Sequence, residues 1–77
     1  MKVEIYSKPN CSLCEDAKEI ILRVQRRVDF VFREVDVTTD LELFHRHRYD
    51  LPVVWVEGEL AFRHRLTEQA LLARLQR

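Results

Sequence analysis

The sequence predicts an α/β fold whose elements follow the order β-α-β-α-β-β-α. Two patterns carry this prediction. Apolar residues recur with the period of a helix over Ser12–Val28, and Val53–Val56 is an uninterrupted apolar run typical of a buried strand. The chain has 77 residues, of which 47% are hydrophobic, and this suffices for one core. We therefore expect residues 1–77 to form a single domain.

The first half of the chain is predicted to fold as strand, helix and strand. Residues 2–6 alternate as in a half-buried strand, and Pro9 marks the loop that follows. The helix over Ser12–Val28 carries acidic residues in its first turn and arginines toward its end, as the helix dipole favours. Phe30–Val37 is rich in β-branched and aromatic residues, which predicts the second strand.

The middle of the chain predicts a short helix followed by a buried strand. Thr38, Thr39 and Asp40 are candidate N-caps for a helix over roughly residues 40–48. Pro52 ends this pattern. The wholly apolar run Val53–Val56 is expected to be buried on both faces of the sheet.

The last part of the chain predicts a hairpin and a final helix. Glu57-Gly58 fits a tight turn into a charged edge strand over Glu59–Arg63. Thr67 is the candidate N-cap of a last helix that ends near Arg77.

Composition narrows the class of protein and its partners. Thirteen basic and 13 acidic residues balance, so charge predicts neither a nucleic acid nor a membrane surface as partner. We expect no secretion signal at the N-terminus, and the longest apolar run is too short to span a bilayer. We expect a cytoplasmic monomer, in which two cysteines are more often catalytic, redox-sensing or metal-binding than a structural disulfide.

The pair Cys11 and Cys14 is the most informative motif of the chain. A C-x-x-C between a predicted strand and a helix is typical of a dithiol redox centre. Two thiols at this spacing can form a disulfide with little chain movement. The free N–H groups and the dipole of the helix N-terminus favour thiolate, which is the attacking species in disulfide exchange.

A metal site is the alternative reading of the cysteines. Tetrahedral zinc usually needs a second pair of ligands, and the only candidates are His45, His47 and His64. The i, i+2 spacing of His45 and His47 does not place both rings on one helix face, so a solvated polar face is the favoured interpretation. We predict no metal site. Trp55 is expected in the core.

Two segments resemble those of a known family. Tyr6-Ser7-Lys8-Pro9-Asn10-Cys11-Ser12-Leu13-Cys14 resembles the active-site segment of glutaredoxins, and Leu51-Pro52-Val53-Val54 resembles their cis-proline segment. The overall match is to short bacterial glutaredoxin-like proteins with a Cys-x-Leu-Cys active site. The resemblance covers the whole chain and implies a thioredoxin-like (glutaredoxin-type) fold, with a central mixed four-stranded sheet flanked by helices.

The resemblance also implies roles for individual residues. Cys11 would be the exposed nucleophile and Cys14 the buried resolving thiol of a thiol–disulfide oxidoreductase. Lys8 would add positive charge beside Cys11, and Pro52 would be cis and face the disulfide. Leu51 would offer backbone groups to an extended substrate.

Tyr6 adjoins the active-site loop, where it would either line the thiol groove or be buried at the strand end. The substrate would be a disulfide-containing protein or a small thiol compound. No cofactor would be bound, and reducing equivalents would come from glutathione or from a thioredoxin-reductase-type protein.

The sequence departs from the glutathione-using pattern of the family. Asp50-Leu51 replaces the usual Thr-Val before the proline, and Phe62–Thr67 replaces a Gly-Gly pair followed by an acidic residue. The Arg63–Arg65 stretch would attract an anionic partner or a glutathione carboxylate. Two other functions stay open from sequence: a redox-idle binding module, and glutathione-dependent iron–sulfur or metal handling.

Overall fold

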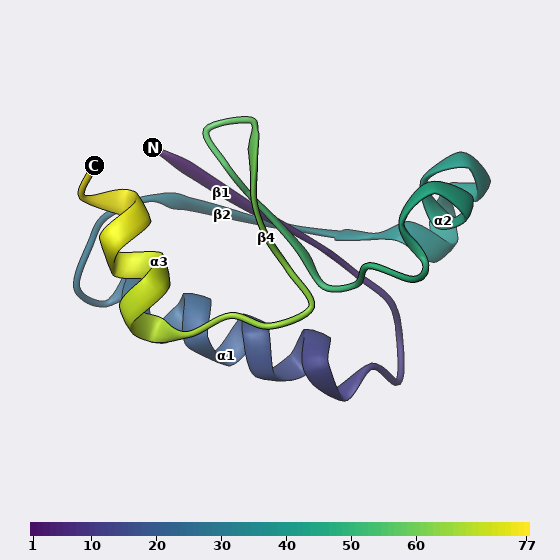
Figure 1. The fold of residues 1–77 in the computed structure, drawn as a ribbon, viewed down its shortest axis with the longest axis horizontal. Coiled ribbons are helices and arrows are strands. Elements are labelled where there is room, and N and C mark those ends of the chain that lie inside the picture. Colours follow the sequence, from purple (N-terminus) through teal and green to yellow (C-terminus); the bar gives the residue numbers. More distant parts are fainter.

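The computed structural model describes all 77 residues and contains one mixed four-stranded sheet in the order β2-β1-β3-β4 (Figure 1). β1 runs parallel to β2 and antiparallel to β3, and β3 pairs antiparallel with β4. The predicted element order and the mixed sheet are confirmed. The elements are β1 (Lys2–Ser7), α1 (Ser12–Gln25), β2 (Val31–Asp36), the short 3-10 helix η1 (Val37–Thr39), α2 (Leu41–His47), β3 (Val53–Val56), β4 (Glu59–Arg63) and α3 (Glu68–Leu75).

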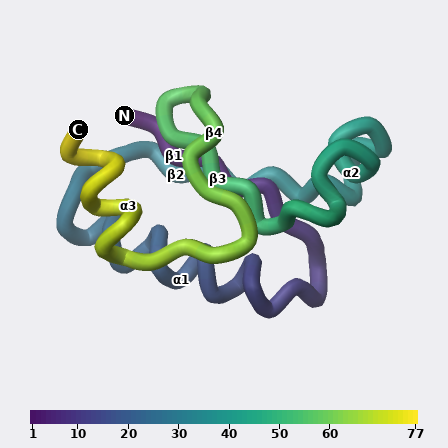
Figure 2. Tube along the Cα trace, viewed as in Figure 1, coloured from purple at the N-terminus to yellow at the C-terminus, as the bar shows by residue number.

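The main core lies on the face of the sheet that α1 and α3 cover (Figure 2). Alternation along β1 directs Val3 and Ile5 to this face, and the helical period of α1 directs Ile21 and Val24 toward them. The eleven buried residues of this core are Val3, Ile5, Ala17, Ile21, Val24, Phe30, Val54, Val56, Leu66, Leu71 and Leu75. Packing of two helices on one sheet face therefore holds the scaffold together.

A smaller core lies near the end of β1, where the start of α1 meets the proline segment. Cys14, Val37, Leu51 and Val53 form it, and α2 lies beyond this end of the sheet in Figure 1. No residue of α2 is fully buried. The expectation that β3 is buried on both faces holds for Val53 but is wrong for Trp55, which is only half-buried because α2 covers little of the sheet face that carries Trp55.

The helices end earlier than the sequence pattern predicted. α1 stops at Gln25, and the N–H groups of Arg26 and Arg27 then donate to carbonyls three residues back, which tightens the last turn. Val28 still packs against the main core. The apolar pattern therefore marked residues that contact the core, including one that lies beyond the end of the helix. No helix of the structure combines the length and the apolar character that crossing a membrane requires.

The turn between β3 and β4 agrees with the predicted Glu57-Gly58 turn. Both residues have positive φ, 51° and 79°, and Val56 pairs with Glu59 across the hairpin. Two successive positive φ angles characterise a type I′ turn, whose twist matches that of the flanking strands. Gly58 is the only glycine of the chain, and it stands where the left-handed conformation requires it.

Burial in the main core predicts different stability losses for two adjacent residues of α1. Ile21 is fully buried and Leu22 is 49% exposed. Ile21→Ala should lower the free energy of unfolding by about 2–5 kcal/mol, because it removes buried methyl groups and leaves a cavity. Leu22→Ala should cost less than about 1 kcal/mol. Urea unfolding of both variants tests this, and equal losses would contradict the assigned faces of α1.

Candidate functional site

The first cysteine of the motif caps the N-terminus of α1. Cys11 has extended backbone angles, and its sulfur accepts the backbone N–H of Cys14 at 3.3 Å. Its carbonyl accepts the N–H of Glu15 at 3.0 Å, which opens the helix. Asn10 just before it takes the left-handed conformation, with φ 59°, that asparagine tolerates. The Cys11 sulfur therefore lies at the positive end of the helix dipole.

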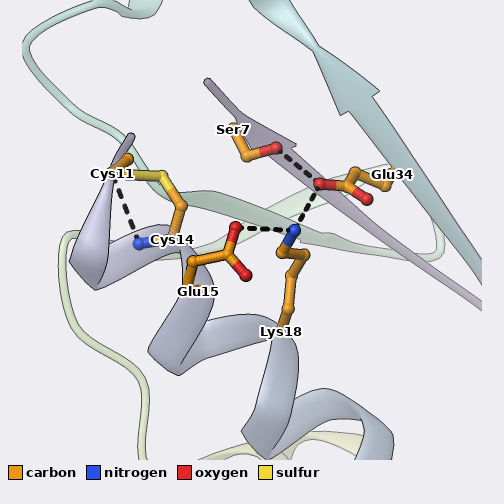
Figure 3. Close-up of a disulfide and its surroundings, with 6 residues drawn as sticks. All are labelled: Ser7, Cys11, Cys14, Glu15, Lys18 and Glu34. Carbon is orange, nitrogen blue, oxygen red and sulfur yellow. Dashed lines mark hydrogen bonds and ion pairs between the residues drawn. A yellow bond between two sulfur atoms is a disulfide. The ribbon is translucent and has the colours of Figure 1, made fainter. Parts of the chain in front are cut away.

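The second cysteine is buried below the first. Cys14 is fully buried, as expected, whereas Cys11, which was expected to be exposed, is only partly exposed. Their Cα atoms lie 5.2 Å apart, and the two sulfurs are joined in a disulfide (Figure 3). The geometry of the helix turn thus lets the pair exist as a dithiol or a disulfide without rearranging the fold.

The proline segment lies in the same small core as Cys14. The Leu51–Pro52 bond is cis, as predicted. Leu51 is buried against the Cys14 cluster, and the carbonyl of Pro52 accepts the N–H of His64 at 2.9 Å. The backbone N–H and C=O of Leu51 make no hydrogen bond within the protein. These two groups are therefore available beside the cysteines.

An aromatic cluster of Tyr6, His47 and Trp55 borders the small core. The Tyr6 ring centroid lies 5.2 Å from that of His47 and 5.4 Å from that of Trp55. Tyr6 is half-buried and packs against the cluster that contains Cys14. The indole N–H of Trp55 is buried and has no hydrogen-bond partner.

The expected solvated face of α2 is correct for His45 and wrong for His47. His45 is exposed, whereas His47 is half-buried against the two aromatic rings. Burial, followed by the charge of Arg46, lowers the pKa of His47; Asp50 acts in the opposite direction and Arg63 in the same one. The i, i+2 spacing separated the two rings as predicted, but only one of them faces water.

A polar network fastens the first turns of α1 to the sheet (Figure 3). Ser7, the only buried polar residue, donates its hydroxyl to Glu34 of β2 at 3.0 Å. Lys18 of α1 lies 2.9 Å from both Glu34 and Glu15. Hydrogen bonds to Glu15 and Glu34 raise the pKa of Lys18. The network therefore connects β1, β2 and α1 next to the cysteines.

A cleft adjoins the cysteine turn. It has a volume of about 160 Å³ and lies between the start of α1 and the connection from β4 to α3. His64 in this connection has φ 66°, a conformation that favours glycine. Lys8 lies in the loop before Cys11 and forms no ion pair. The residues lining the cleft are Leu13, Asp16, Ala17, His64, Arg65, Leu66 and Thr67.

Several residues of the site were missed from sequence. His47, Glu34 and Lys18 meet the cysteine region only through the fold and belong to no local motif. Ser7 lies in the segment that resembles a glutaredoxin active site, but its bond to Glu34 depends on strand pairing. Parallel pairing of β1 with β2 brings Glu34 to the sheet end, and this pairing was the one available signal for the network. No group of three histidine, cysteine or acidic side chains is arranged to hold a metal ion.

Fold and site together define a thioredoxin-type protein with a cysteine pair at the start of α1. The family model of the Glutaredoxin-like domain (DUF836) matches residues 2–76. The chain therefore belongs to this glutaredoxin-like family within the thioredoxin superfamily. The family and the neighbouring cysteine pair indicate redox capability.

Individual relatives agree with this family. The Glutaredoxin-like protein YDR286C homolog of Dictyostelium discoideum is 29% identical, over 92% of this chain and 71% of the relative. The X-ray structure of target protein XcR50 from X. campestris has a TM-score of 0.79 at 23% identity, covering 96% of this chain and 95% of the other. E. coli glutaredoxin has a TM-score of 0.65 at 15% identity, covering 99% and 94%. The two structures establish the shared fold.

The placement of His47 predicts a pH dependence of stability. Its pKa in the folded protein lies below the ordinary value of about 6.5, so the unfolded chain binds more protons below that pH. The stability from neutral His47 should be complete above about pH 6.5 and should decline on acidification. His47→Gln should lose less stability than the wild type between about pH 7 and 5 in urea unfolding, whereas His45→Gln should follow the wild type. Identical profiles for all three proteins would contradict the burial of His47.

Proposed function

We propose that the protein is a thiol–disulfide oxidoreductase in which Cys11 attacks and Cys14 resolves. One observation carries the proposal: the sulfur of the partly exposed Cys11 caps α1, within disulfide reach of a fully buried Cys14. The N–H of Cys14 and the helix dipole both stabilise negative charge on the Cys11 sulfur. Burial disfavours the thiolate form of Cys14, so the two thiols have different roles.

The reaction transfers two electrons from the dithiol to a substrate disulfide. Cys11 thiolate attacks one substrate sulfur, a Cys11–substrate disulfide forms, and the first substrate thiolate leaves and takes a proton. Cys14 then loses its proton and attacks the Cys11 sulfur, which breaks the mixed disulfide and releases the second substrate thiol. The protein ends as the Cys11–Cys14 disulfide, and the substrate is reduced.

The backbone beside the cysteines supports binding of an extended substrate. Leu51 has an unpaired N–H and C=O, while Pro52 is anchored to His64. A substrate segment that pairs with Leu51 would gain strand-type hydrogen bonds and place its disulfide next to Cys11. Tyr6 packs against the same small core as Leu51, and Lys8 lies in the loop before Cys11; they complete the proposed binding residues.

The oxidised protein requires an external reductant. The proposal places it as a monomer in the reducing cytoplasm, where a thioredoxin-reductase-type protein or glutathione returns the disulfide to the dithiol. No bound cofactor takes part, because thiol exchange moves both electrons through sulfur. The substrate is a disulfide in a protein or in a small thiol compound.

Serine substitutions should separate the two thiol roles. Cys14→Ser should accumulate mixed disulfides with substrates, since no thiol remains to resolve them. Cys11→Ser should lose disulfide reduction, by at least about a hundredfold, because the exposed nucleophile is absent. Mass spectrometry of the trapped species and turnover of a model protein disulfide measure both effects. Full turnover by Cys11→Ser would show that the proposed nucleophile is wrong.

Glutathione should be a poor reductant compared with a protein reductant. A tight glutathione site must pair two carboxylates and an ammonium. The stretch from Phe62 to Thr67 has no glycine and no acid, and His64 and Arg65 project bulk into the cleft there. Each lost charged contact costs about 1.5–3 kcal/mol, or about one to two decades of affinity.

The measurement is steady-state reduction of a glutathionylated substrate at millimolar glutathione, with a glutathione-specific glutaredoxin alongside. Reduction by a thioredoxin-reductase system with NADPH is measured on the same protein. Equal turnover of this protein and the reference glutaredoxin with glutathione would overturn the prediction. Arg63, Arg65 and Lys8 would then be the candidates for an alternative glutathione site.

A further inference from the structure

Four cations without ion pairs lie on segments that adjoin the cysteine site. Lys8, Arg48, Arg63 and Arg65 form no ion pair, although the chain as a whole has no net charge. Unpaired cations concentrated around a reactive group raise the local concentration of anionic partners. We name these four side chains, together with Tyr49, the basic rim.

The fold brings these cations to the cysteines from separate elements. Lys8 lies in the loop that leads to Cys11. Arg63 ends β4 directly opposite Val53, the residue that follows Pro52. Arg65 lines the cleft beside Leu13, in the cysteine turn. These three cations therefore come from three segments that adjoin the cysteine site: the β1–α1 loop, the end of β4 and the connection to α3.

The end of α2 supplies the remaining part of the rim. Arg48 caps α2, and its guanidinium carbon lies 4.7 Å from the centroid of the Tyr49 ring and 5.9 Å from that of Phe44. Phe44 in turn packs against the small core that contains Cys14. Tyr49 is 78% exposed. Arginine and tyrosine are the residue types that most often anchor protein interfaces, so this stack is suited to a protein partner.

No acid forms an ion pair with a rim cation, although two acids, Asp16 and Asp50, lie in the same region. Asp50 lies 3.9 Å from His64, Glu42 pairs with Arg46, and Asp16 lines the cleft with Arg65. Besides burial and Arg46, the charge of Arg63 lowers the pKa of His47. Cations of α2 and β4 thus act on one shared region beside the cysteines.

We propose that the basic rim recruits acidic protein substrates, whose disulfide is flanked by aspartate or glutamate. This inference rests on the proposed function and names its substrate class. Carboxylates on either side of the substrate cystine would meet Arg48 on one side and Arg63 and Arg65 on the other, while Tyr49 supplies apolar contact. The chemistry of the exchange is unchanged, and the rim acts on encounter and docking.

The experiment compares two peptides that differ only in the residues flanking one disulfide, glutamate in one and lysine in the other. Single-turnover rates with the reduced protein should favour the acidic peptide by about fivefold to tenfold at low ionic strength, as expected for two or three exposed ion pairs. The preference should approach unity near 1 M salt, where the Debye length is about 3 Å. Equal rates at low salt would overturn the proposal.

Matched charge reversals locate the effect on the surface. Arg48→Glu/Arg63→Glu should abolish or invert the preference. Arg23→Glu/Arg26→Glu changes the net charge equally, and these arginines also lack ion pairs but lie at the far end of α1, about 20 Å along the helix axis. The control variant should keep the wild-type preference. A loss of preference in both variants would show that total charge, not the rim, is responsible.

Two further measurements separate this inference from the proposed function. Reduction of neutral bis(2-hydroxyethyl) disulfide tests the dithiol chemistry alone. Fluorescence anisotropy with labelled peptides that carry serine for cysteine tests docking to the oxidised protein, whether or not exchange occurs. Tighter, salt-sensitive binding of the acidic peptide supports the rim, and equal binding overturns it. A rim-dependent reaction with oxidised glutathione, without discrimination between the peptides, would assign the rim to a small anionic thiol and refute an acidic protein substrate.

Discussion

The capping of α1 by Cys11 is the interaction on which the site depends. It places one sulfur at the helix N-terminus, where an N–H group and the dipole stabilise negative charge. The same first turn carries Cys14 inward to the small core with Leu51 and Val53. One local structure thus makes two chemically similar thiols unequal. The sheet and the remaining helices serve to hold this turn against the proline segment.

One face of the sheet carries the main core, and the other face carries the residues proposed to recognise a partner. α1 and α3 bury the larger core on one face, and this core contains none of the proposed site residues. The other face is only partly covered, and there Tyr6, His47 and Trp55 meet beside the cysteines. Because α2 has no fully buried residue, it can present Arg48 and Tyr49 to a partner at little cost in packing.

Local patterns predicted the parts of the structure that local physics determines. The helix N-cap at Thr67, the turn at Glu57-Gly58 and the strand at Val53–Val56 all follow from neighbouring residues. Contacts between segments that are distant in the sequence could not be predicted from local patterns. His47 looked like surface because nothing in its own helix reveals that Tyr6 and Trp55 lie beneath it. The bond from Ser7 to Glu34 spans 27 residues and depends on strand register.

The most direct test of unequal thiols is competitive alkylation of the fully reduced protein near neutral pH, with the labelled cysteine identified by mass spectrometry. The capped, partly exposed Cys11 should react first, at least about tenfold faster than the buried Cys14, because thiolate character and access both favour it. Unfolding in urea should bring the two rates close together. Preferential labelling of Cys14 in the folded protein would contradict the central role given to the Cys11 cap.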